Sequence, residues 1–436
     1  MVKSSFISPC DVVSIPIEMK ALFYDIHPAG WAGAYLLKRF WKGALLSRLN
    51  GLVLREVPLP ELPTDEWVIC RTLLGGICGS DLAIIAQRQP VDSILQCYTT
   101  LPMIPGHENV AVVEKVGSAV DSRWIGKRVC VEPTLCCKVR GIYPPCKPCS
   151  QGNFGACENF SADGEGTSHL PPGTSLGYCG AVGGSWAEYF LAHVSQLVEV
   201  PENLTDTQAI LTDPLACSLH AVLRADLTDA KHVLVYGAGI LGLGVVWALR
   251  QIGFDGKIDI IARYPHQGQI AKEFGADDIL YLPVDKQERF RIIAKKTDGI
   301  VKQARFGNLM LSGGYDVVFE CVGAEETIEE ALIWTAARGQ VILVGTGHGR
   351  GTDMTPIWFR ELTVIGAYGR SVERYRGREI QTYQLVHELM LQSTCDVSTL
   401  LTGTFPLHEY KLALKTALDK GKNKSIKVAF KFEFPT

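Results

Sequence analysis

Four side chains that zinc favours as ligands occur at three separate points of the chain. Cys78 stands in a glycine-rich turn, His107 and Glu108 are adjacent, and Asp213 directly precedes a proline. One thiolate, one imidazole and a carboxylate, with one coordination position left for substrate, are typical of catalytic rather than structural zinc. With a glycine-rich nucleotide loop downstream, these residues indicate an enzyme that transfers hydride with the help of a metal.

The residues around this set support the same interpretation. A lone cysteine such as Cys78 is more often a buried, unreactive residue than a ligand. The combination with His107 and Glu108 makes the metal site the stronger hypothesis. We expect Asp81 to accept a hydrogen bond from the second ring nitrogen of His107, which fixes the tautomer and raises the basicity of the imidazole.

A second cysteine cluster lies in the middle of the chain. Cys146 and Cys149 form a CxxC pair, and Cys157 follows at an offset of eight residues. A lone CxxC suits a redox pair, whereas the third cysteine favours a structural zinc site, whose closed shell leaves no position for substrate. The fourth thiolate would come from Cys136 or Cys137, reaching across the loop 140–145.

The nucleotide loop follows an apolar segment, 232–236, and precedes a run that suits a helix up to Arg250. In that context the backbone can approach a pyrophosphate at the positive end of the helix. The residues expected to contact the cofactor here are Gly237, Gly239, Ile240, Leu241 and Gly242.

The end of the next strand carries no acid to bind a ribose hydroxyl. Ala262 stands at that position and is followed by Arg263 and Tyr264. A guanidinium suits a 2′-phosphate, so we expect NADP in preference to NAD; the alternative is a solvated arginine in an NAD enzyme. The nicotinamide half is expected near two pairs that end later strands, Val322-Gly323 and Val344-Gly345.

Composition limits the remaining possibilities. The chain has 436 residues, which is long enough for two domains, and a net charge of −3 without a basic tail argues against nucleic-acid binding. Fourteen cysteines without a secretory signal suggest metal binding in a reducing cytoplasm rather than disulfides. The uncharged run 233–249 is too short to span a membrane and contains the nucleotide loop, so no membrane association is expected.

The expected fold class is α/β with two domains. Short alternating segments between 52 and 200 predict a small, partly closed β-barrel. From 204 onward, strands alternate with helices, which predicts a parallel, doubly wound sheet. The strand expected at 426–431 suits a return to the first domain. We therefore predict an extension over 1–18, a catalytic domain over 19–203 and 371–436, and a dinucleotide domain over 204–370.

Two segments look like insertions. Residues 27–50 carry four basic and no acidic side chains, while Leu37, Trp41, Leu45 and Leu49 recur near helical spacing. This predicts a cationic amphipathic helix, and a surface insertion that caps its neighbours is preferred over a membrane-binding or substrate-lid role. Residues 285–313 are expected to form a long polar connection.

These motifs together resemble the zinc-dependent medium-chain dehydrogenase/reductase family, whose members are similar to alcohol dehydrogenases, over nearly all of 19–432. The resemblance implies a GroES-like catalytic domain and a Rossmann domain. It implies that Cys78, His107 and Asp213 bind the catalytic zinc, with Glu108 as an alternate or outer ligand. Ser80 matches the hydroxyl that passes the substrate proton toward solvent, while the histidine frequent three positions later is replaced by Ala83.

The resemblance also bears on the structural zinc and on function. Tyr143 replaces the usual first cysteine, and variants with a longer lobe favour Cys137 over Cys136 as the fourth ligand. The implied reaction oxidises an alcohol, sugar, polyol or amino alcohol with NAD(P), and a cytoplasmic homodimer or homotetramer is expected. The alternatives are a zinc-independent NADPH-dependent quinone or enone reductase and a non-catalytic NADP-binding protein.

Overall fold

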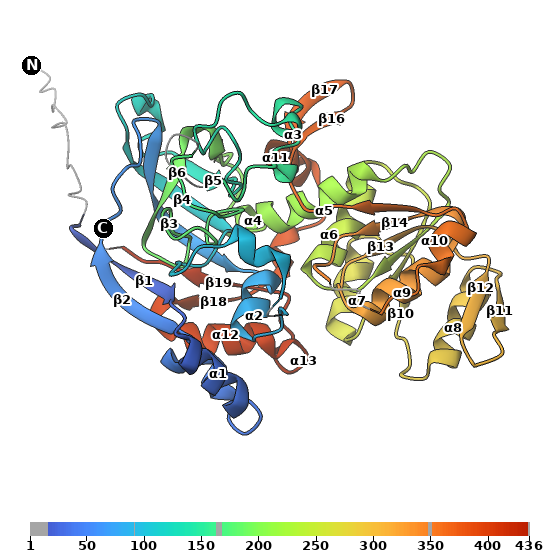
Figure 1. Ribbon diagram of the computed structural model, residues 1–436. Helices are drawn as coiled ribbons and strands as arrows, with labels where there is room; N and C mark the ends of the chain where they lie inside the picture. The colour runs from blue at the N-terminus through green and yellow to red at the C-terminus, as the bar shows by residue number, and fades with distance from the viewer. Residues whose placement is uncertain (1–15, 91, 163–167, 348–350, 435–436) are drawn as a thin grey trace, which may run out of the picture.

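The computed structural model describes residues 16–90, 92–162, 168–347 and 351–434. Figure 1 shows two domains side by side, joined by helices that cross between them. The predicted N-terminal extension lies outside the described residues except for its last three, of which Glu18 already belongs to the first strand. Within the described residues, no helix is long and apolar enough to cross a membrane.

The first domain, called the catalytic domain below, is built on a seven-stranded sheet in which most neighbouring strands are antiparallel. Its longest strand, β3, is buried along nearly its whole length and pairs with β4, β6 and β19. The strands are β3 (Trp67–Ile77), β4 (Asn109–Val116), β5 (Arg128–Val131), β6 (Tyr189–His193), β7 (Leu197–Glu199), β18 (Leu401–Pro406) and β19 (Lys427–Lys431), with the separate pair β1 (Glu18–Tyr24) and β2 (Leu52–Pro58) beside them.

The C-terminal strand returns to this sheet, where Val428 lies opposite Ile77 in the antiparallel pair of β19 and β3. The return positions the helices that precede β19 close to the first residues after β3. The helices of the catalytic domain are α2 (Gly79–Ile85), α3 (Lys147–Ser150), α12 (Tyr410–Leu418) and α13 (Lys420–Asn423).

The second domain, called the cofactor domain, contains a six-stranded parallel sheet in the order β10-β9-β8-β13-β14-β15. Helices cover both faces of this sheet, as in a doubly wound fold (Figure 1). Its strands are β8 (His232–Tyr236), β9 (Lys257–Ile261), β10 (Asp278–Leu280), β13 (Tyr315–Glu320), β14 (Thr335–Leu343) and β15 (Thr363–Gly366), and its helices are α6 (Ile240–Gln251), α7 (Pro265–Glu273), α9 (Glu325–Trp334) and α10 (Thr355–Phe359).

The junction between the domains consists of α4 (Asp206–Ala209), α5 (Thr212–Arg224), the hairpin β16 (Val372–Tyr375) and β17 (Arg378–Gln381), and α11 (Thr382–Gln392). Helix α5 is amphipathic and almost wholly buried, and it packs against both α6 and α11. The first turn of α5 is therefore held at the boundary where a cleft between the domains opens.

The segment 285–313 is not the irregular connection expected from its polarity. It forms α8 (Lys286–Lys296) and the hairpin β11 (Ile300–Gln303) and β12 (Leu309–Ser312). Phe290 and Ile293 on α8 and Leu311 on β12 are fully buried and extend the core of the cofactor domain. The apolar residues that build this core are few, whereas Ile300 and Phe306 of the same segment are exposed. The average polarity of the segment therefore misled the sequence prediction.

The insertion 27–50 also differs from the single amphipathic helix that was expected. Helix α1 (Pro28–Leu37) ends early, and two 3₁₀ helices follow, Lys42–Leu46 and Arg48–Asn50. Of the four residues expected on one apolar face, Leu37, Trp41 and Leu49 are exposed. The helical spacing of these apolar residues in the sequence is therefore a coincidence, because the helix ends among them.

Candidate active site

Cys78 lies where β3 ends and α2 begins. The backbone N–H of Cys78 donates to Oδ2 of Asp81 at 3.0 Å, so the carboxylate in the first turn of α2 fixes the backbone that carries the thiol. Asp81 is almost fully buried. The position of the sulfur therefore depends on a strand end and a helix start, both rigid.

His107 and Glu108 come directly before β4. Gly106 precedes them with a φ of 97°, and a Cβ at this position would collide with the ring of Trp186. The left-handed turn at Gly106 therefore aims both side chains toward the end of β3. One donor atom each from Cys78, His107 and Glu108 lie within 4.8 Å of one another.

This spacing fits a shared zinc ion. Zinc binds thiolate sulfur at about 2.3 Å and imidazole nitrogen at about 2.0 Å, so two donors on one ion lie within about 4.4 Å of each other. The donors are sulfur, nitrogen and oxygen, the mixture that suits zinc. Small adjustments of three side chains would bring them onto one metal.

Asp213, in the first turn of α5, is outside this group of three donors. Its Oδ1 accepts a hydrogen bond from Tyr383 at 2.5 Å and pairs with the guanidinium of Arg370. Burial opposes its charge, but Arg370 and then His107 hold the pKa of the carboxyl below its usual range. The carboxylate of Asp213 thus contacts Arg370 and Tyr383 and is not grouped with the donor atoms of Cys78 and His107.

Glu108 has a partner that sequence reasoning missed. Nζ of Lys427, on β19, donates to both carboxylate oxygens at 2.5 and 2.7 Å, and both side chains are buried. Burial disfavours the ammonium, yet Glu108 raises the pKa of Lys427 above its ordinary value. A Cβ on Gly76 would collide with the Glu108 carboxylate, so the glycine in β3 makes room for this pair.

A second missed residue, Tyr178, lies beside the proton-carrying groups. Its hydroxyl donates to Oδ1 of Asp81 at 3.2 Å, and Ser80 directly precedes Asp81 in the first turn of α2. Its ring is 5.5 Å from that of His107. Nδ1 of His107 is 3.6 Å from Oδ1 of Asp81 and has no hydrogen-bond partner among the described residues. The carboxylate thus lies at the edge of the ring, but the hydrogen bond that we expected is not formed.

The cysteine-rich lobe brings four thiols together. Donor atoms of Cys137, Cys146, Cys149 and Cys157 lie within 4.8 Å of one another, with Cys157 at 3.6 Å from Cys137 and 3.9 Å from Cys146. Tetrahedral zinc–thiolate geometry places sulfur atoms about 3.8 Å apart, so the set fits a structural zinc ion. Of the two candidates for the first position, Cys137 is in this set.

Arg140 organises the backbone of this lobe. Its guanidinium is fully buried and donates to carbonyl oxygens at several points of the lobe, including those of Leu135, Phe160 and Leu170 at 2.8, 3.0 and 3.1 Å. Burial lowers its pKa from the ordinary value. Carbonyl partners that converge on one cation hold together a lobe with little regular secondary structure.

The nucleotide loop adopts the arrangement that its glycines predict. Gly237 has a φ of 105°, and a Cβ on Gly242 would collide with the carbonyl oxygen of Gly237. In contrast, no described atom lies within 4 Å of a Cβ built on Gly239, which caps α6. The start of α6, at Ile240 and Leu241, therefore has open space where a pyrophosphate could approach.

The loop after β9 faces a segment of the catalytic domain. Arg263 is exposed and its guanidinium lies 5.6 Å from the ring of Tyr264. A Cβ on Gly421 of α13 would come within 2.6 Å of the Tyr264 ring, so α13 is in direct contact with this loop. Ala262, just before, is buried.

The loops after β13 and β14 pack back to back. Gly323 has a φ of 79°, and its N–H, like that of Val322, donates to the buried carboxylate of Glu320. A Cβ on Gly345 would collide with the backbone nitrogen of Gly323. Val344 and Gly345 line a cleft between the domains together with Arg370 and residues of the cysteine-rich lobe.

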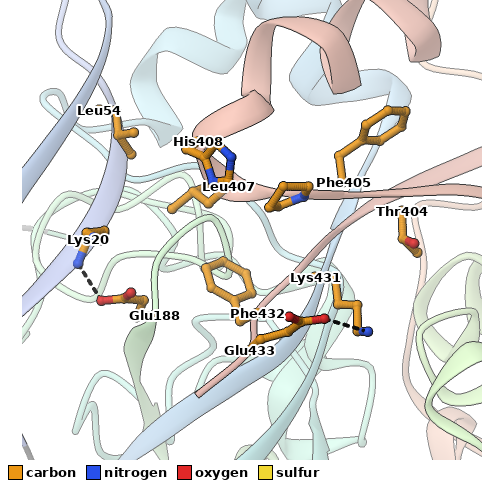
Figure 2. Close-up of a pocket in the computed structure, with 11 residues that line it drawn as sticks. Lys20, Leu54, Glu188, Thr404, Phe405, Leu407, His408, Lys431, Phe432 and Glu433 are labelled. Carbon is orange, nitrogen blue, oxygen red and sulfur yellow. Dashed lines mark hydrogen bonds and ion pairs between the residues drawn. The ribbon is translucent and has the colours of Figure 1, made fainter. Parts of the chain in front are cut away.

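Another hollow lies away from these groups. Figure 2 shows it between β1, β2 and the C-terminal strands, with Lys431 and Glu433 paired within it. None of the predicted site residues lines it. We therefore place the candidate active site at the cleft and not in this hollow.

Known proteins resemble this chain over most of its length. The family model described as the alcohol dehydrogenase GroES-like domain matches residues 64–202, and the one described as zinc-binding dehydrogenase matches 241–385. A sorbitol dehydrogenase of Arabidopsis thaliana is 29% identical over 391 residues, covering 89% of this chain and 94% of that protein. An L-idonate 5-dehydrogenase of Vitis vinifera is also 29% identical, covering 89% and 93%.

Solved structures of the same kind share the whole fold. An alcohol dehydrogenase from Escherichia coli in complex with NADH has a TM-score of 0.70 at 20% identity, covering 96% of this chain and all of that one. Both domains, the GroES-like barrel and the Rossmann sheet, are therefore arranged as the sequence predicted.

Proposed function

Because the chain belongs to the zinc-dependent medium-chain dehydrogenase family, we propose that it is an NAD(P)-dependent enzyme that oxidises a CH–OH group of a polyol or sugar-derived alcohol. Relatives named for sorbitol and L-idonate support this substrate class. The convergence of donor atoms from Cys78, His107 and Glu108 is the observation that carries the proposal.

The proposed enzyme uses two zinc sites with different donors. Cys78, His107 and Glu108 would hold the catalytic ion, with Asp213 close by as a charged neighbour, and the four cysteines of the lobe would hold a structural ion. A bound zinc ion is a Lewis acid that lowers the pKa of a substrate hydroxyl, and the nicotinamide accepts the hydride. Nζ of Lys427 donates to both carboxylate oxygens of Glu108 and so fixes the position of this carboxylate at the edge of the site.

Ser80 and Tyr178 are proposed to move the substrate proton. Both residues are next to Asp81, because Ser80 precedes it in α2 and the hydroxyl of Tyr178 donates to its carboxylate. A chain of hydroxyls can pass a proton without any group carrying a lasting charge. Tyr178 thus supports a path that does not need the histidine replaced by Ala83.

We further propose that NADP is preferred over NAD. Arg263 is exposed at the end of β9, and Lys424 lies close enough to His266 on α7 to lower the pKa of that imidazole, after the larger effect of burial. Nε2 of His266 is buried without a hydrogen-bond partner among the described residues. Two cations from the two domains would therefore face a 2′-phosphate.

A polyol panel tests the proposed function directly. Purified protein is assayed with sorbitol, L-idonate and simple secondary alcohols, using NADP and NAD, before and after dialysis against a chelator. We expect activity that disappears when zinc is removed and returns when zinc is added. The variant Cys78→Ser is expected to lose the catalytic ion and activity but to keep the zinc of the lobe. Full activity of Cys78→Ser would contradict the proposal.

A further inference from the structure

The segment between α1 and the first 3₁₀ helix exposes an unusual group of large apolar side chains. Leu36 is 71% exposed, Phe40 86% and Trp41 54%. Elsewhere, Trp358 and Phe359 of α10 are exposed next to each other, whereas Phe306 is exposed alone, which is normal for a protein surface. We call this group the aromatic tip; its members are Tyr35, Leu36, Leu37, Phe40 and Trp41.

The tip is held rigidly by the rest of the insertion. Ala34, Ala44 and Leu46 are buried, and Leu46 belongs to the hydrophobic core of the catalytic domain. Nδ2 of the buried Asn50 donates to the carbonyl oxygen of Ile85 at 2.8 Å, and Nε2 of Gln87 donates to the carbonyl oxygen of Trp31 at 2.9 Å. An insertion that merely capped its neighbours would bury its aromatic side chains, whereas this one fixes them toward solvent.

The charges around the tip have one sign. Lys38, Arg39 and Lys42 stand among its apolar members, and residues 26–55 contain no acid, although the whole chain carries a net charge of −3. Nζ of Lys38 lies 3.9 Å from the centre of the Tyr35 ring. Among the described residues, no carboxylate pairs with these three cations. The tip therefore combines apolar bulk with an uncompensated positive charge.

We propose that the aromatic tip docks the protein on an anionic lipid surface. Aromatic rings and leucines that enter the interface, with lysine and arginine at the level of lipid phosphates, are the pattern of proteins that lie on membranes without crossing them. A second copy of the chain is a poor occupant, because a symmetric contact would bring the same cations together. Figure 1 shows α1 at the lower edge of the catalytic domain, away from the cofactor domain, so docking leaves the interdomain cleft free.

Vesicle binding tests the proposal. The full chain is sedimented with phosphatidylcholine vesicles that do or do not contain phosphatidylserine. We expect binding only to the anionic vesicles, weakening as salt is added. Replacing Lys38, Arg39 and Lys42 together by Ser should weaken it about a hundredfold. The double variant Phe40→Ser, Trp41→Ser should abolish it.

A matched control uses an equally exposed aromatic residue on the other domain. Phe306→Ser, in the hairpin of β11 and β12, should bind vesicles like the unchanged protein, because Phe306 is 97% exposed and isolated. The tip variants should keep dehydrogenase activity and thermal midpoint, which shows that they fold. Equal binding to both vesicle types, no binding, or an oligomer lost from the tip variants in the absence of lipid would each overturn the proposal.

Discussion

At the scale of single residues, the buried ion pair of Glu108 and Lys427 connects the candidate site to β19. Replacing Lys427 by Met leaves an unpaired carboxylate in the core, so we expect a loss of about 3–5 kcal/mol in the free energy of unfolding. Adding Glu108→Gln should recover much of that loss. Urea unfolding of the two single variants and the double variant measures the coupling energy between the two side chains. If the losses of the single variants simply add up in the double variant, the two side chains are not coupled and the prediction is wrong.

A site residue could be predicted from the sequence when the residues around it in the chain formed a motif. It could not be predicted when its partner lies far away in the sequence. Cys78, His107 and Glu108 stand in local motifs, so their types and neighbours sufficed. Lys427 contacts Glu108 across 319 positions, and only the register of β19 against β3 brings them together. Tyr178, 97 positions from Asp81, lies in a loop without any periodic pattern. Asp213 was assigned to the ligands by resemblance, whereas Arg370 and Tyr383 hold its carboxylate.

At the scale of elements, α13 contributes to cofactor choice from the opposite domain. Lys424→Ala and Arg263→Ala are each expected to raise KM for NADP about tenfold, because each removes one cation from the 2′-phosphate, and to leave KM for NAD nearly unchanged. Steady-state kinetics with both cofactors gives KM for NADP and KM for NAD, and hence the ratio of the two constants. As a control, Lys415→Ala alters another lysine of the C-terminal region, on α12, and should change neither constant. An equal effect of Lys424→Ala on both cofactors would show that α13 acts only through stability.

The cysteine-rich lobe depends on Arg140 as well as on its metal. Arg140→Met leaves several buried carbonyl oxygens without donors, which we expect to cost at least about 3 kcal/mol and to release the structural zinc. Emission spectroscopy should find one zinc fewer per chain, and trypsin should cut the lobe faster. Lys138→Met, an exposed cation in the same lobe, is the control and should retain both ions. Unchanged zinc content in Arg140→Met would refute the role of this residue.

Element types were predictable where periodicity and length agreed, as in β8, β9 and β13. The prediction of a single helix failed at the insertion. Apolar residues there recur every four positions, although α1 ends and a 3₁₀ helix begins between them. The prediction failed again at 285–313, where the buried Phe290 and Leu311 were too few to reveal α8 and its hairpin by average composition.

At the scale of the whole molecule, the junction between the domains carries a pH-dependent contribution to stability. His387 on α11 is buried, Nε2 lies 3.0 Å from the hydroxyl of Thr212 on α5, and burial lowers the pKa of its imidazole to about 4. The unfolded chain takes up this proton below about pH 6.5, but the folded protein resists it until about pH 4. Stability should therefore fall by about 3 kcal/mol as the pH drops through that window.

The variant His387→Gln removes this titration. Its free energy of unfolding, measured by urea at several pH values, should have a shallower slope between pH 6.5 and about 4, smaller by about 1.4 kcal/mol per pH unit. His408→Gln changes an exposed histidine and serves as the control. If His387→Gln has the same slope as the unchanged protein, His387 is not the source of the loss of stability in acid.

The late position of β19 in the chain has a consequence for synthesis. β19 lies in the interior of the catalytic sheet, beside β3, and leaves the ribosome after every strand of the cofactor sheet. The cofactor sheet can thus form during translation before the catalytic sheet receives β19. A truncated product that stops before Lys427 would have its nucleotide-binding half intact and no counterion for Glu108, so supplying zinc to it could not rebuild the missing half.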